Sequence, residues 1–228
     1  MSENTIKLAQ AEIDRLLGKN TDALKKELKV DDIKVERSVV KNILTEKGMD
    51  GFDSLMKSVI GEFSLDIKNR YASVRDRKII VAKTELINAA DFEAELTYPA
   101  FIYKVDICGA IAFIKLDSFL FCALSGIPFD GRIKINEFQQ IVLKNEIIPL
   151  LMHAVLNCFG STVSRDVMKI SIIDEKSFKS DEKIKKNETG VLAIINWNEN
   201  FKSFGVEKIW LSQEFLGLIK KTKLLNEK

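Results

Sequence analysis

The sharpest alternation of hydrophobic and polar residues in the chain lies between Pro99 and Gly126. Residues 101–107 alternate bulky and polar side chains, residues 108–109 (Cys-Gly) are typical of a tight turn, and residues 110–116 form a second β-rich run. This pattern predicts a β-hairpin.

A short buried helix is predicted directly after the hairpin. Asp117 or Ser118 can cap its start, and Gly126 can end it. Only a narrow side of this helix can face water, because most of its side chains are apolar. The apolar residues are Phe119, Leu120, Phe121, Ala123 and Leu124.

Two longer segments have the apolar spacing of amphipathic helices. The first runs from Phe52 to about Tyr71, and the second runs from about Asn136 to Phe159, where Gly160 ends it. Pro149 is expected to bend or divide the second helix, because proline lacks the amide hydrogen that an α-helix uses. The positions expected to face inward are Phe52, Leu55, Met56, Val59, Ile60, Phe63 and Ile67 in the first helix, and Phe138, Ile141, Val142, Ile148, Leu151, Met152, Val155 and Leu156 in the second.

Further strands complete two halves of one pattern. Strands are predicted at 79–81, 167–173, 191–195 and 206–211, and Ser212 can cap a last helix. Each half then runs as long helix, three strands and short helix, and the endings GAIAFIKLDSFL and GVEKIWLSQEFL align with one inserted residue. We expect an α/β (α+β) fold in which a continuous six-stranded sheet with a pseudo-two-fold axis is flanked by helices.

An amphipathic segment stands at the start of the chain. It places Leu8 or Ala9, Ile13, Leu16 and Leu17 at helical spacing. A helix of this length is marginal on its own in water, so it either packs on its own domain or docks into a groove on a partner.

The domain organisation follows from this segment and the spacer behind it. We expect a partner-binding peptide over residues 1–18, a linker that can be partly helical over 19–48, and a domain over 49–225, with Gly48 and Gly51 at the boundary. The alternative is that residues 6–17 are simply the first helix of the fold.

Composition excludes several classes of protein. The 35 basic and 33 acidic residues nearly balance, so no field of one sign favours nucleic acid or an anionic membrane. Cys108, Cys122 and Cys158 lie in apolar runs without CxxC spacing, and His153 is the single histidine, so we expect no metal site, no cofactor and a reducing, cytoplasmic location. No signal-peptide pattern opens the chain and no apolar run approaches a membrane span, so we expect no direct membrane insertion.

Two parts of the sequence resemble one known family. The repeat, the hairpin ending in Leu-Asp-Ser-Phe-Leu and the loop over residues 125–132 are similar to the middle domain of FliM, the flagellar motor switch protein, whose wider group includes FliY and the CheC and CheX phosphatases. Separately, residues 8–17 (LAQAEIDRLL) are similar to the segment by which FliM and FliY capture phosphorylated CheY, usually written Leu-Ser-Gln-x-Glu-Ile-Asp-x-Leu-Leu. The first match covers roughly residues 50–223 and is diffuse, whereas the second is short and close.

The resemblance implies a cytoplasmic protein at the flagellar basal body that receives the chemotaxis signal. In that family the segment docks as a helix on CheY, with apolar anchors that correspond here to Leu8, Ile13, Leu16 and Leu17 and polar contacts that correspond to Gln10, Glu12 and Asp14. Implied rotor partners are FliG, FliM, FliN or FliY.

The loop after the buried helix departs from the family. In FliM it carries a Gly-Gly-x-Gly motif that binds FliG, whereas here Ile127-Pro128-Phe129 interrupts it. The candidate rotor-partner loop therefore comprises Gly126, Ile127, Phe129, Asp130, Gly131 and Arg132. Its apolar residues either anchor a different partner or fold back on the core.

The phosphatases of the group use a Glu and an Asn three residues apart on each long helix. At the comparable positions this chain has His153 and Leu156 in the second helix and Lys57 and Ile60 in the first, so we expect no enzymatic activity. The alternatives are a divergent CheY phosphatase and a purely structural FliM paralogue. FliM and FliY also continue into a FliN-like domain, which implies that this sequence is a fragment or a paralogue without that module.

Overall fold

The computed structural model describes residues 40–41, 43–94, 101–127, 137–161, 167–174, 177–178, 187–199 and 202–219. All of them belong to one compact unit, Val35–Lys228. The predicted peptide over residues 1–18, and Phe129, Asp130, Gly131 and Arg132 of the candidate loop, lie outside the described residues.

The described elements follow the predicted order. They are α3 (Glu46–Arg70), a 3-10 turn (Ala72–Val74), β1 (Lys78–Asn88), α4 (Ala89–Ala94), β2 (Phe101–Ile107), β3 (Ala110–Leu116), α5 (Ser118–Ser125), α6 (Glu137–Val142), a π-helical turn (Leu143–Ile147), α7 (Ile148–Phe159), β4 (Met168–Ile173), β5 (Thr189–Glu199), β6 (Lys202–Leu211) and α9 (Gln213–Leu216).

The strands form one antiparallel six-stranded sheet in the order β1-β5-β6-β3-β2-β4. A pseudo-two-fold axis between β6 and β3 exchanges the two halves, and the first strand of each half lies beside the hairpin of the other half. This arrangement confirms the predicted sheet and repeat. Because each half supplies an outer strand to the other, neither half has a complete sheet of its own.

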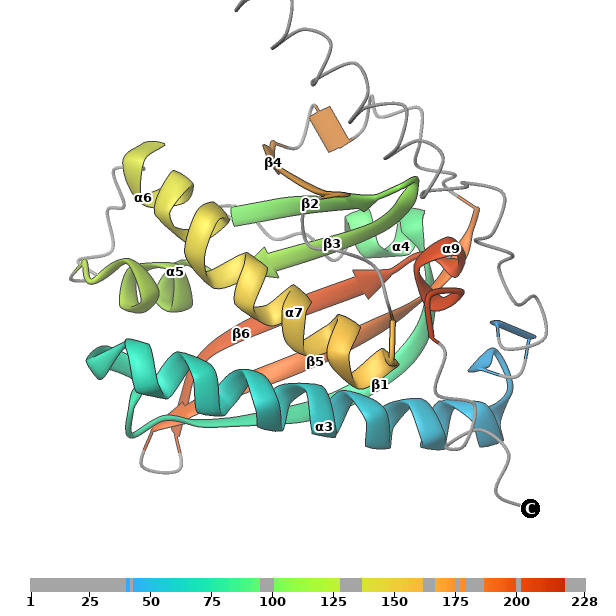
Figure 1. The fold of residues 1–228 in the computed structure, drawn as a ribbon, viewed down its shortest axis with the longest axis horizontal. Helices are drawn as coiled ribbons and strands as arrows, with labels where there is room; N and C mark the ends of the chain where they lie inside the picture. The colour runs from blue at the N-terminus through green and yellow to red at the C-terminus, as the bar shows by residue number, and fades with distance from the viewer. Residues whose placement is uncertain are drawn as a thin grey trace, which may run out of the picture. The chain divides into compact units, whose positions relative to one another are not determined.

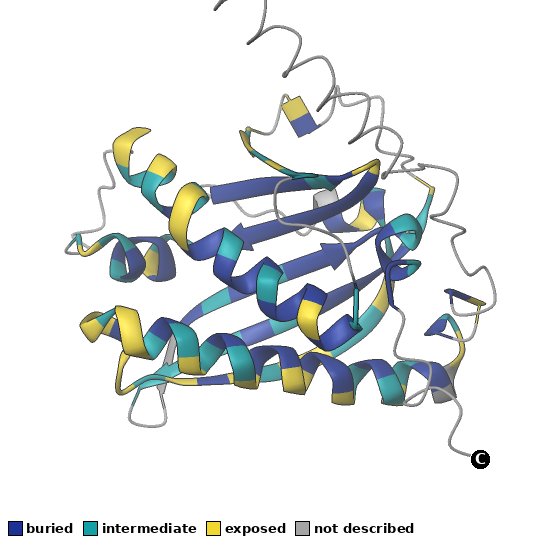
Figure 2. Cartoon of the chain, viewed as in Figure 1, coloured by how far each residue is buried: buried dark blue, intermediate teal, exposed yellow. Residues whose placement is uncertain are grey.

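Helices cover both faces of the sheet. The long helices α3 and α7 lie side by side on one face, and α4 lies behind the sheet (Figure 1). On the α3 face, the ring of Phe63 meets that of Trp197 edge to face at 6.1 Å between ring centroids. Figure 2 shows that the buried residues of both long helices follow the side towards the sheet.

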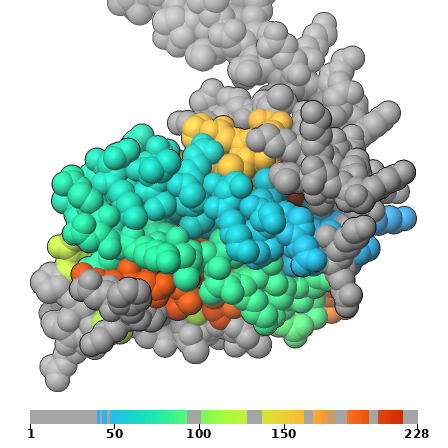
Figure 3. All heavy atoms as spheres, turned by 90° about the horizontal axis from the view of Figure 1, so that it is seen from below, coloured from blue at the N-terminus to red at the C-terminus, as the bar shows by residue number. Residues whose placement is uncertain are grey.

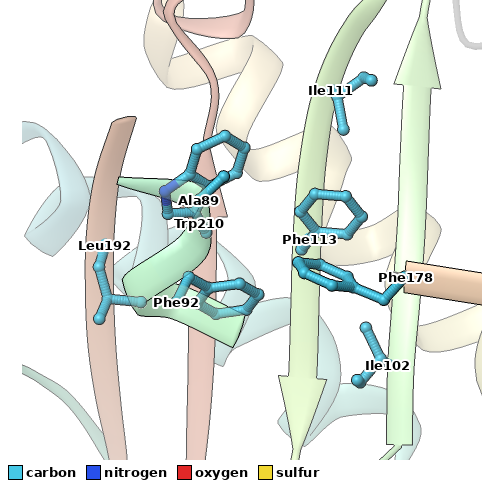
Figure 4. Packing of buried hydrophobic residues seen from close by; sticks show 8 residues of the cluster. All are labelled: Ala89, Phe92, Ile102, Ile111, Phe113, Phe178, Leu192 and Trp210. Atoms are coloured by element: carbon cyan, nitrogen blue, oxygen red, sulfur yellow. The ribbon is translucent and has the colours of Figure 1, made fainter. Parts of the chain in front are cut away.

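A second cluster fills the opposite face under α4 (Figure 4). Phe92 of α4 stacks near Phe113 and Trp210, at 6.1 and 6.3 Å between ring centroids. Phe178 packs against Phe113 at 4.8 Å. Both faces of the central strands are therefore buried, as their near-continuous apolar runs require.

Helix α3 begins earlier than its apolar spacing predicted. Thr45 caps the helix, because its side-chain oxygen accepts a hydrogen bond from the Gly48 amide at 3.1 Å. The helix begins at Glu46, so the predicted start at Phe52 is six residues too late. Both Gly48 and Gly51 lie inside the helix. Val40 and Ile43, which precede it, are buried. All the positions of α3 that were expected to face inward are buried, which confirms the periodicity.

The second long helix contradicts its prediction at one end. Phe138 and Ile141 were expected to face inward but are 68% and 46% exposed. The reason is the π-helical turn over Leu143–Ile147, which adds one residue to a turn and so rotates α6 relative to α7. Pro149 was expected to bend or divide this helix, and the π-helical turn divides it just before the proline.

Cys108 lies in an apolar run of the sequence but is exposed, because it occupies the predicted tight turn of the β2–β3 hairpin, with a positive φ of 53°.

The expectation that no apolar run approaches the length of a membrane span is wrong for one helix. The stretch Glu137–Phe159 is long and apolar enough to meet the criteria for a membrane span. However, 56% of its most apolar window is buried inside the fold, as in the core helix of a soluble protein, and one such helix is weak evidence for a membrane span.

Candidate functional site

Two residues of the candidate loop are described. Gly126 ends α5 in the left-handed conformation, at φ 69°, and its amide donates to the Ala123 carbonyl. The Ile127 amide donates to the Cys122 carbonyl at 2.9 Å, and the Ile127 side chain is half-buried. The loop therefore leaves α5 from a well-formed helix end, and Gly126 has the role that the sequence predicted for it.

A polar cluster lies where α3 and α7 meet. The Asn157 amide of α7 donates to Glu62 Oε1 of α3 at 2.7 Å, and the Cys158 thiol lies 3.5 Å from Glu62 Oε2. The Asn157 side-chain nitrogen is also 3.5 Å from His153 Nδ1. We call this group, Glu62, His153, Asn157 and Cys158, the seam cluster. Figure 3 shows the side of α3 next to this seam, with β1 along the other edge of the helix.

A second bridge crosses the same seam nearer the end of α3. The Tyr71 hydroxyl donates to Glu146 Oε2 at 2.6 Å. Burial, and then the hydrogen bond to Glu146, raise the pKa of Tyr71 to about 12. The two bridges therefore join α3 to the second long helix at two points along the seam.

Three members of the seam cluster are accessible to solvent, and the fourth, Cys158, is buried. Asn157 is exposed, Glu62 and His153 are partly exposed, and Leu65, one turn beyond Glu62, is 68% exposed. A carboxylate, an amide and an imidazole can here contact a partner protein or orient a water molecule. Their arrangement suits polar recognition around one exposed apolar side chain.

The sequence patterns did not predict the seam cluster, because the Glu and Asn of the related phosphatases lie three residues apart on one helix, whereas Glu62 and Asn157 lie on different helices. The available signal was that both residues occupy outward positions of the two helices predicted to cover one sheet. His153, which lies at a position comparable to one of the phosphatase residues, is half-buried at the seam.

The described part of the chain has no cluster of metal-ligating side chains, and it has a buried carboxylate at Glu207. No group of three or more His, Cys, Asp or Glu side chains there could hold a metal ion. Glu207 is 2% exposed and accepts a hydrogen bond from the Trp197 indole at 3.2 Å. Burial raises the pKa of Glu207 to about 7, and the side chain belongs to the core.

Comparison with known proteins identifies the fold. No family model and no curated protein sequence matches the chain. Among solved structures, the FliM middle domain from H. pylori matches 81% of this chain and 100% of its own length, with a TM-score of 0.59 and 12% identity. FliM in a FliG-FliM complex from H. pylori gives a TM-score of 0.58 at 13% identity, over 81% of this chain and 100% of that one. FliY from Thermotoga maritima gives 0.56 at 13% identity, over 82% and 99%. The chain therefore has the fold of the FliM middle domain, which FliY shares.

Proposed function

We propose that this protein is a flagellar motor switch protein, or associates with the switch, and that it binds phosphorylated CheY and rotor proteins without being an enzyme. It would act in the cytoplasm at the basal body and couple the chemotaxis signal to rotation. The observation that carries the proposal is the match to nearly the whole FliM middle domain, together with the CheY-binding pattern at the start of the same chain.

Residues 1–18 are the proposed site for CheY. Leu8, Ile13, Leu16 and Leu17 form the apolar stripe of a helix that docks into a groove. Gln10, Glu12 and Asp14 supply polar contacts at its edges. The residues between this helix and Val40, which is buried in the domain, would hold the helix near the domain at high local concentration, which raises the probability of capture.

The loop over residues 126–132 is the proposed site for a rotor protein. The H. pylori FliM that this chain resembles in fold was crystallised in complex with FliG. In this chain Ile127 stands at the start of the loop, half-buried beside the end of α5. The proposed partner is therefore FliG or another rotor protein of the FliM, FliN or FliY type.

Titration of the full chain with activated CheY tests the signalling half. Ile13→Asp places a charge in the apolar stripe and is expected to abolish binding. Asn20→Asp makes the same change of charge in the tether and is expected to leave binding intact. If neither variant loses binding, residues 1–18 are not the site for CheY. A variant that loses capture of a rotor protein but keeps CheY binding would show that the two sites are separate.

One observation favours a second function, hydrolysis of the acyl phosphate of CheY. The seam cluster brings a carboxylate, Glu62, and an amide, Asn157, together across two helices. Phosphate release from phospho-CheY, measured with and without the full chain, separates this function from binding alone. We expect no acceleration. An acceleration that Asn157→Ala removes, and that Asn69→Ala on α3 keeps, would assign hydrolysis to the seam cluster.

A further inference from the structure

The helix between residues 137 and 159 contains one residue more than an α-helix can accommodate. At the π-helical turn Leu143–Ile147, the Ile148 amide donates to the Leu143 carbonyl, five residues back. Pro149 follows directly, and its ring crowds the carbonyl four residues earlier, at Asn145, in an unbroken α-helix. The proline therefore favours the wider turn.

The wide turn sets the orientation of α6. One residue corresponds to about 100° of rotation about the helix axis. In the present register Phe138 and Ile141 are 68% and 46% exposed. The same register buries the Gln139 side-chain oxygen, which has no hydrogen-bond partner. Helix α6 thus points apolar groups outward and a polar group inward, against its own sequence pattern.

A second register is available to the same residues. In an unbroken α-helix Ile141 would lie about two turns before Ile148, on the stripe that α7 buries against the sheet. That register would bury Ile141 and turn Phe138 inward, but it would expose Leu143, which is now fully buried, and bring Lys144 towards the core. Each register therefore buries some of the apolar residues, and neither register buries all of them.

We propose that α6 exchanges between these two registers and that the π-helical turn is the hinge. The exchange would present Phe138 and Ile141 to a partner or withdraw them. The use of this device for partner binding rests on the proposed function, whereas the exchange itself does not. Single π-helical turns inside α-helices are often found at functional sites, and helix register shifts are an established kind of switch.

The test is the rate at which a thiol at position 141 reacts with a maleimide. The full chain carries Cys108→Ser, which removes the exposed native thiol, and Ile141→Cys as the reporter; Cys122 and Cys158 are buried. Adding Pro149→Ala removes the preference for the wide turn. It is expected to slow labelling by about tenfold, because the reporter turns inward.

Deleting Asn145 in the Pro149→Ala protein provides the counter-test. The deletion removes the extra residue, so the helix becomes continuous while α6 keeps its present orientation. Fast labelling is expected to return. A matched control, Leu65→Cys on α3, is equally exposed in every background and should react at one rate throughout.

Two results would overturn the proposal. The first is a labelling rate at position 141 that Pro149→Ala leaves unchanged. The second concerns the unaltered chain and applies if circular dichroism shows that Pro149→Ala does not fold. If amides 142–148 of the unaltered chain exchange hydrogen only through global unfolding, a local register change is excluded. Exchange of those amides through a smaller opening supports it.

Discussion

Asp117 and Ser212 are equivalent residues that join the two halves of the sheet. The Asp117 amide donates to the Val206 carbonyl at 3.1 Å, and the Ser212 amide donates to the Ile111 carbonyl at 3.0 Å. Each side chain then accepts in return: Asp117 Oδ2 from the Val206 amide at 2.6 Å, and Ser212 Oγ from the Ile111 amide at 3.2 Å. The pseudo-two-fold relation therefore extends from the strands to individual hydrogen bonds.

The first prediction concerns these two residues. Asp117 and Ser212 also cap α5 and α9, by accepting the amides of Leu120 and Phe215. Asp117→Ala is expected to lower the free energy of unfolding by about 2 kcal/mol, since a cap and a bond to the other half are lost together. Ser212→Ala is expected to cost about 1 to 2 kcal/mol. Urea denaturation measures both. Asp117→Asn keeps an acceptor and should lose less; a loss as large as that of Asp117→Ala would contradict the capping role.

The second prediction concerns the pH dependence of stability through Glu207. Strand pairing places Glu207 between Ile195 and Leu116, so its environment is apolar. Burial raises the pKa of Glu207 from 4.5 to about 7 in the folded protein. The folded state therefore binds a proton more tightly than the unfolded state, and this stabilisation is complete below pH 4.5 and is lost as the pH rises through 7.

Replacing Glu207 by Gln removes this dependence and keeps an acceptor for the Trp197 indole. The variant is expected to match the parent near pH 4 and to be more stable by about 3 kcal/mol at pH 8, from the size of the pKa shift. Urea denaturation at intervals from pH 4 to pH 8 provides the measurement. Parallel curves for the two proteins would show that Glu207 does not titrate in this range.

The third prediction compares two glycines. A Cβ atom at Gly190 would lie 2.4 Å from the Leu211 carbonyl oxygen and 2.6 Å from the Trp210 ring, so backbone and ring would both have to move. Gly190→Ala is expected to cost about 3 kcal/mol. Gly61→Ala is the control: it lies within α3 with nothing near the added atom, and should gain about 1 kcal/mol from helix propensity. Equal effects on the melting temperature would contradict the close approach at Gly190.

Periodicity predicted the elements whose signals lie within one segment. The inward positions of α3 and the caps at Asp117 and Ser212 depend on neighbouring residues only, so one sequence is enough to find them. Strands β1 and β5 are longer than predicted because their ends are polar or half-exposed and break the apolar run.

What could not be predicted depends on residues far apart in the chain. The exposure of Phe138 follows from a one-residue register change, which a window of apolar spacing averages away. The hydrogen bond between Glu62 and Asn157 joins two helices that are separated in the sequence by the three strands of the first half. The packing of the helices decides which residues of α3 and α7 face each other, whereas the repeat pattern specifies only that the two helices are neighbours.

The most direct test of the proposed function is the affinity of the full chain for CheY with and without activation by beryllofluoride, measured by calorimetry. Because a response regulator presents a different groove when activated, we expect activation to tighten binding by about tenfold. The tightening should disappear with Ile13→Asp and remain with Asn20→Asp. Equal affinities for the two forms of CheY, or no binding to either, would contradict a role in receiving the chemotaxis signal.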